Sequence, residues 1–94
     1  MVASTNTVKQ NNVSGSTVAG IRLIGTASGN VLKDNAVSSS AAGIEFVLTL
    51  TEWAQGNELK ANTLSANVCG IKGPTAGNTL KDNVLDGNTA DTCS

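Results

Sequence analysis

Residues 29–37 read GNVLKDNAV, and nearly the same phrase returns as GNELKANTL at residues 56–64 and as GNTLKDNVL at residues 77–85. The shared pattern is N-x-[VL]-K-x-N-x-[VL], which also occurs once earlier in the chain. Its four copies start at Asn6, Asn30, Asn57 and Asn78, with spacings of 24, 27 and 21 residues. A repeat at such a period indicates a solenoid, in which each copy stacks on the next.

A second phrase follows each of the first three copies. It reads AGIRL at 19–23, AGIEF at 42–46 and CGIK at 69–72. Each repeat therefore contains three short extended pieces, with apolar residues at period 2 and turn-forming residues between them. Because a helix needs roughly ten residues, these pieces predict strands, and one coil of three strands per repeat. Neighbouring coils would pair as parallel strands about 4.8 Å apart in a parallel β-helix.

This Asn-rich repeat resembles the right-handed parallel β-helix of the pectin-lyase-like superfamily. In style it is similar to NosD-type periplasmic proteins and to the repeats of carbohydrate-binding and sugar-hydrolysing domains. The resemblance spans about residues 5–90 and implies an all-β, right-handed solenoid. The four repeats predict about four coils, and a length of 94 residues suits a single domain over residues 1–94. It implies an architecture rather than an activity, since one fold serves many functions.

Equal positions in successive copies predict the interior and the corners. The interior should contain three aliphatic columns: Val8/Leu32/Leu59/Leu80, Val13/Val37/Leu64/Leu85 and Ile21/Ile44/Ile71, the last extended by Leu23 and Phe46. The eight Asn residues of the repeat should occupy the corners. Asn tolerates left-handed backbone geometry, and stacked Asn amides can bond one another from coil to coil.

Two outward rows of charge are expected. Arg22, Glu45 and Lys72 follow the Gly-Ile pair and would form a ladder of alternating sign, which predicts either surface ion pairs or a ligand site. The other row contains four lysines, with Asp34 and Asp82 beside two of them: Lys9, Lys33, Lys60 and Lys81. It predicts either a track for an anionic polymer such as an acidic polysaccharide or a solvated face that discourages edge aggregation.

The segment VLTLTEWAQ, residues 47–55, interrupts the repeat as a loop insertion. In solenoids such insertions project from one face, which is often the binding face. This segment contains Trp53, the only Trp, and Glu52. Aromatic side chains stack on sugars or anchor partner proteins, so one interpretation is ligand binding. The other is that the loop packs over an exposed patch.

Cys69 and Cys93 are the two cysteines of the chain. If the turn at 86–91 is three residues longer than its counterpart, Val68-Cys69 lies beside Thr92-Cys93, and Cα atoms about 5 Å apart suit a disulfide. A disulfide would imply an oxidising compartment. The alternative is two stacked free thiols.

The residue inventory offers little for catalysis. His is absent, which excludes Ser-His-Asp and Cys-His schemes, and Arg22 is the only Arg. Enzymes of the resembling superfamily use an Arg or Lys base with Asp-bound calcium, or a cluster of Asp residues, and the sequence shows no such cluster. Glu45 and Glu52, near Arg22 and Lys72, are the remaining candidates for paired carboxylate chemistry. Without His, and with Met1 as the only Met, zinc and NosD-type copper chemistry are poorly supported, and no metal or cofactor is expected.

Net charge and hydropathy limit the classes of binding partner that the sequence predicts. A net charge of −1 does not favour nucleic acid, and no apolar run is long enough to cross a membrane. The start of the chain lacks the features of a signal peptide, although a secreted, periplasmic or cell-surface location is expected. Open solenoid ends or the 47–55 loop predict a homo-oligomer, most commonly a symmetric dimer, or membership of a longer solenoid.

Three functions therefore remain. The first is a non-catalytic module for recognition or scaffolding, with a polysaccharide or a partner protein as its ligand. The second is a fragment or degenerate relative of a polysaccharide lyase or hydrolase. The third is a purely structural solenoid segment.

Overall fold

The computed structural model describes residues 5–25, 27–47 and 54–93, in which all regular structure is β-strand. Within these residues the chain forms twelve short strands: β1 Thr7–Lys9, β2 Asn12–Ser14, β3 Ile21–Ile24, β4 Val31–Lys33, β5 Ala36–Ser38, β6 Ala42–Val47, β7 Glu58–Lys60, β8 Thr63–Ser65, β9 Cys69–Lys72, β10 Thr79–Lys81, β11 Val84–Asp86 and β12 Ala90–Cys93. Three consecutive strands make one coil.

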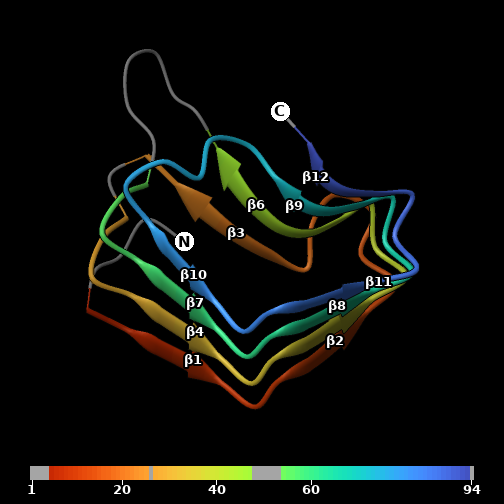
Figure 1. Cartoon of the computed structure of the whole chain (residues 1–94), viewed down its shortest axis with the longest axis horizontal. Coiled ribbons are helices and arrows are strands. Elements are labelled where there is room, and N and C mark those ends of the chain that lie inside the picture. Colours follow the sequence, from red (N-terminus) through yellow and green to blue (C-terminus); the bar gives the residue numbers. More distant parts are fainter. Residues whose placement is uncertain (1–4, 26, 48–53, 94) are drawn as a thin grey trace.

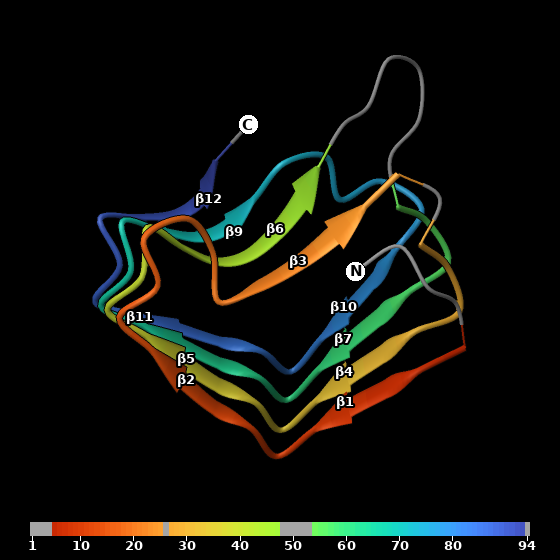
Figure 2. The ribbon, with the colours of Figure 1, turned by 180° about the vertical axis from the view of Figure 1, so that it is seen from behind.

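The strands form three parallel four-stranded sheets, each with one strand from every coil. Their orders are β1-β4-β7-β10, β2-β5-β8-β11 and β3-β6-β9-β12. The first two sheets meet in a V and the third lies across its opening, as Figures 1 and 2 show from opposite sides. The chain thus rises through about three turns from its first coil to its fourth, and the predicted parallel β-helix is confirmed.

The predicted aliphatic columns form the core. The strand registers align Val8 with Leu32, Val13 with Val37 and Ile21 with Ile44, and the later copies continue each column. Leu32, Leu59, Leu64 and Ile44 are fully buried, whereas Leu80 of the last coil is 39% exposed. A column is completed only where coils lie on both sides of a residue, so burial is greatest in the middle coils.

The backbone conformation at the corners differs from the prediction in one respect. The left-handed backbone belongs to the residue before each corner Asn, not to the Asn itself: Gln10, Asp34, Ala61 and Asp82 have φ values of 57°, 56°, 54° and 56°. Gly29, Gly56 and Gly77 fill the same role before Asn30, Asn57 and Asn78. The Asn side chain is thereby left pointing along the stack.

Asn amides form hydrogen-bonded ladders along the corners. The backbone N–H and the Nδ2 of Asn35 both donate to Oδ1 of Asn62, at 3.1 and 3.0 Å, and Asn62 donates in the same way to Asn83. The ladder from Asn6 to Asn78 repeats this arrangement. These contacts satisfy amides that are otherwise buried, such as Asn62 at 0% exposure.

The structure contains a third corner ladder that the repeat pattern did not predict. It contains Ser16, Ser40, Asn67 and Asn88, linked from coil to coil by backbone N–H groups that donate to Ser Oγ or Asn Oδ1. Asn67 and Asn88 lie five residues after Asn62 and Asn83, which was the available signal. Because two of its members are Ser, the common Asn pattern did not reveal it.

In the last coil the predicted register of the cysteines is wrong. Cys69 pairs with Ala90, not with Cys93, and Cys93 lies opposite Lys72. The turn before Ala90 is therefore as long as the turn before Cys69, and the coil contains no extra residues. The two cysteines are nevertheless joined by a disulfide, with Cα atoms 6.1 Å apart. The bond attaches the last strand, β12, to β9.

Candidate functional site

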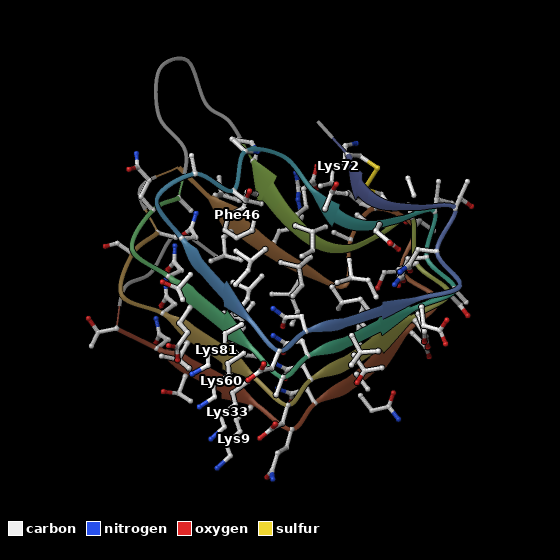
Figure 3. The ribbon with its side chains drawn as sticks, viewed as in Figure 1. Lys9, Lys33, Phe46, Lys60, Lys72 and Lys81 are labelled. Atoms are coloured by element: carbon white, nitrogen blue, oxygen red, sulfur yellow. A yellow bond between two sulfur atoms is a disulfide. The ribbon has the colours of Figure 1, made fainter. Side chains whose placement is uncertain are left out.

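The lysine column, Lys9, Lys33, Lys60 and Lys81, lies on the outer face of the sheet β1-β4-β7-β10. Strand register places each lysine directly beside the next. Figure 3 shows the four side chains in one row, pointing away from the core. The row exists because the residue before each lysine is an inward aliphatic, and successive side chains of a strand alternate between faces.

The lysine column has three acidic neighbours and no ion pair with them in the described residues. Lys9 and Lys81 are exposed, and Lys33 and Lys60 are partly buried. Glu58 shares the face of Lys60, whereas Asp34 and Asp82 lie at the adjacent corner. In the described part of the chain none of the four ammonium groups forms a salt bridge. The column can therefore attract an anion that approaches the sheet.

The second charged row, here called the ion-pair ladder, consists of Arg22, Glu45 and Lys72 in the third sheet. Register aligns them as predicted. Nε of Arg22 lies 3.0 Å from Oε1 of Glu45, and Nζ of Lys72 lies 3.9 Å from Oε2. Oε1 is buried without a hydrogen-bond partner, so its contact with Arg22 is an ion pair rather than a directed hydrogen bond. The mutual pairing of the three charges favours a structural role over ligand binding.

The aromatic and acidic candidates of the insertion cannot be placed beside this ladder. Trp53 and Glu52 lie outside the described residues, as does most of the 47–55 loop. Ala54, at the end of the loop, is fully buried in the core. The proposed pair of carboxylates, Glu45 with Glu52, thus remains a prediction.

The donor chemistry does not fit a soft transition metal. The sequence contains no His, and both cysteines are in the disulfide. Among the residues the structure describes, no group of three or more His, Cys, Asp or Glu side chains could hold a metal ion. Copper prefers imidazole, thiolate and thioether ligands. The sole thioether is that of Met1, outside the described residues.

An open hollow of about 450 Å³ lies between the segment that follows β9 and the end of β12. Its lining residues are Gly73, Pro74, Thr75, Ala76, Thr92 and Cys93. None of these has a side chain that could act as a general acid or base while the disulfide is intact. The described residues also contain no helix that is long and apolar enough to span a membrane.

Comparison with known proteins gives one family. The model of the family described as "Periplasmic copper-binding protein (NosD)" matches residues 1–93. No curated protein and no solved structure matches the chain. The match covers nearly the whole sequence, and the parallel coils and corner Asn ladders agree with the β-helix expected of such a protein. The chain therefore belongs to the NosD family.

Proposed function

We propose that this chain is a non-catalytic recognition module that binds a linear acidic polysaccharide along the lysine column. The observation that carries the proposal is the register of Lys9, Lys33, Lys60 and Lys81, which aligns four cations along the axis of the solenoid. Adjacent strands of a sheet are about 4.8 Å apart. An extended polymer with a carboxylate on each sugar can therefore contact several lysines at once.

Electrostatics favours such a ligand. Four like charges in one row repel one another, and a polyanion replaces that repulsion with attraction. In the described residues the salt bridges involve Arg22, Lys72 and Glu45, so the lysine column does not have to break an ion pair before it binds. The four strands are already stacked, so the backbone needs no reordering, and the entropic cost of binding is limited to the rotamer freedom that the lysine side chains lose.

The family and the disulfide support a periplasmic or cell-surface location. The family description is of periplasmic proteins, and disulfides persist in that oxidising compartment. Cell-envelope polysaccharides are accessible there. Copper forms no part of the proposal, because the donor set of this chain does not fit it.

Binding to polygalacturonate and alginate, measured by titration calorimetry over a range of NaCl concentrations, tests the proposal. We expect affinity to fall as salt increases, since the contacts are ionic. Replacing both central lysines, Lys33→Gln with Lys60→Gln, should weaken binding about tenfold or more, equivalent to about 1.4 kcal/mol. Neutral dextran should not bind.

Lys72→Gln is the matched control, because Lys72 is an exposed lysine on a different sheet. It should leave the affinity unchanged. Equal loss in both variants, or equal binding of dextran, would contradict the lysine column as the site. Absence of binding to either polyuronate would favour a purely structural role for the solenoid.

A further inference from the structure

A column of glycines runs through the third sheet. Gly20, Gly43 and Gly70 precede the inward Ile of their strands and lie above one another. A Cβ atom added at Gly43 would lie 2.5 Å from the carbonyl oxygen of Gly70, and one added at Gly20 would lie 3.0 Å from that of Gly43. None of the three has a positive φ, so glycine is needed here for space rather than for backbone conformation.

These hypothetical Cβ atoms all point the same way. Each one faces the carbonyl of the following coil, toward the C-terminal end of the stack. At Gly70 the facing atom is the carbonyl oxygen of Asp91, 2.7 Å away. Close stacking of this sheet thus requires that the earlier coil of each pair has glycine at this position.

The fourth coil breaks the column. Asp91 lies opposite Gly70, between the pairs Ala90/Cys69 and Thr92/Ile71. By the geometry of the three glycines, its Cβ points off the end of the stack, where a fifth coil would place a carbonyl oxygen. The approach would be about as close as those at Gly43 and Gly70, which no Cβ atom tolerates. The carboxylate would also face that oxygen.

The remainder of the C-terminal end suits further stacking. Leu80 and Leu85 leave their columns incomplete, at 39% exposure for Leu80. The carbonyl of Asn62 accepts from Val84 of the next coil, and the carbonyl of Asn83 holds the equivalent position at the open end. On a second copy, the corresponding donor would be the N–H of Asn12. The exposed core residue Leu80 and the Asn83 carbonyl thus offer positions that a further coil could fill, and Asp91 obstructs its approach.

We infer that Asp91 is a stop residue, which prevents the first coil of a second copy from stacking on the fourth. Charged residues that point off a sheet edge are a known protection against edge-to-edge association. Here the block is steric, at the Cβ atom, and the carboxylate adds to it. Without it, repeated head-to-tail contacts would generate open filaments, because a heterologous interface that does not close continues indefinitely.

Sedimentation velocity over a hundredfold range of protein concentration tests the inference. The unsubstituted chain should show no head-to-tail association, and Asp91→Gly should form oligomers that grow with concentration. Asp91→Ala is the matched control, because it removes the charge but keeps the Cβ atom. It should behave like the unsubstituted chain.

Thr7→Pro identifies the contact. Val31 N–H donates to Asn6 O within the chain, so the equivalent N–H of Thr7 points away from the second coil, toward the N-terminal side of the stack. Proline there removes that donor, and Thr7→Pro combined with Asp91→Gly should lose the association. Circular dichroism establishes that each variant is folded.

Three results would overturn the inference. One is folded Asp91→Gly that sediments like the unsubstituted chain. Another is Asp91→Ala that associates as strongly as Asp91→Gly. The third is association of the unsubstituted chain that Thr7→Pro abolishes. That result would mean that the chain stacks head to tail even with Asp91 in place.

Discussion

Arg22 and Glu45 occupy the same position in neighbouring coils, and Nε of Arg22 lies 3.0 Å from Oε1 of Glu45. The Glu45 side chain is only 13% exposed, whereas that of Arg22 is 42% exposed and that of Lys72, on the other side, 50%. A carboxylate with so little contact with water is poorly solvated, and the two cations compensate for the lost hydration. The ladder therefore contributes to stability as a unit of three charges.

Glu45→Gln should lower the free energy of unfolding by about 1 kcal/mol, because both ion pairs are lost while the shape of the side chain is kept. Urea denaturation in low salt and in 1 M NaCl measures the effect, which should shrink as salt screens the charges. Asp86→Asn is the control, since Asp86 is exposed and forms no salt bridge in the described residues. A loss of the same size in Asp86→Asn would contradict a specific role for the ladder.

Asn62→Ala should cost more than any single charge, about 3 kcal/mol. Oδ1 of Asn62 accepts from Asn35, and its Nδ2 donates to Leu32 O and to Asn83 Oδ1, both at 2.9 Å. Truncation leaves several buried groups unpaired. Chemical denaturation measures the loss. Asn12→Ala, at an exposed strand position, should change stability by less than about 0.5 kcal/mol. Similar values for both variants would mean that the ladder adds nothing beyond strand pairing.

Gly43→Ala should destabilise the protein by about 3 kcal/mol, because the new methyl group meets the carbonyl oxygen of Gly70 and the coils must separate. Thermal unfolding followed by circular dichroism reports the change. Gly15→Ala provides the comparison: its φ is +72° and nothing lies within 4 Å of the added Cβ, so only backbone strain of about 1 kcal/mol is expected. If Gly43→Ala proved as mild as Gly15→Ala, close packing of the glycine column would be wrong.

Reduction of the Cys69–Cys93 disulfide should lower the free energy of unfolding by about 3 kcal/mol. The sequence separation of 24 residues sets the loop-closure entropy that the bond removes from the unfolded chain. The melting temperature, measured with and without dithiothreitol, should fall by roughly 10 °C or more. A chain with both Cys69→Ala and Cys93→Ala should melt low in either condition. Dithiothreitol-independent melting of the unsubstituted chain would contradict the prediction.

The coil, the three inward columns and the two outward rows of charge could all be predicted from the repeat pattern. The reason is geometric: in a parallel stack, equal positions of successive copies lie beside one another, and alternation along a strand assigns each residue to the inside or the outside. Leu32, Leu59 and Leu80 could therefore be aligned without coordinates, as could the lysine column.

Features that depend on distances between coils became clear only from the folded chain. The left-handed residue precedes the corner Asn because the amide must point along the stack, and local propensity alone favoured the Asn. Glycine is needed at position 43 because a carbonyl oxygen of the next coil lies close to it, and the sequence does not show that distance. For the same reason the sequence does not show the significance of Asp91, which replaces glycine in the fourth coil. Burial of Glu45 and the register of Cys93 likewise depend on how neighbouring coils pack, which no single repeat encodes.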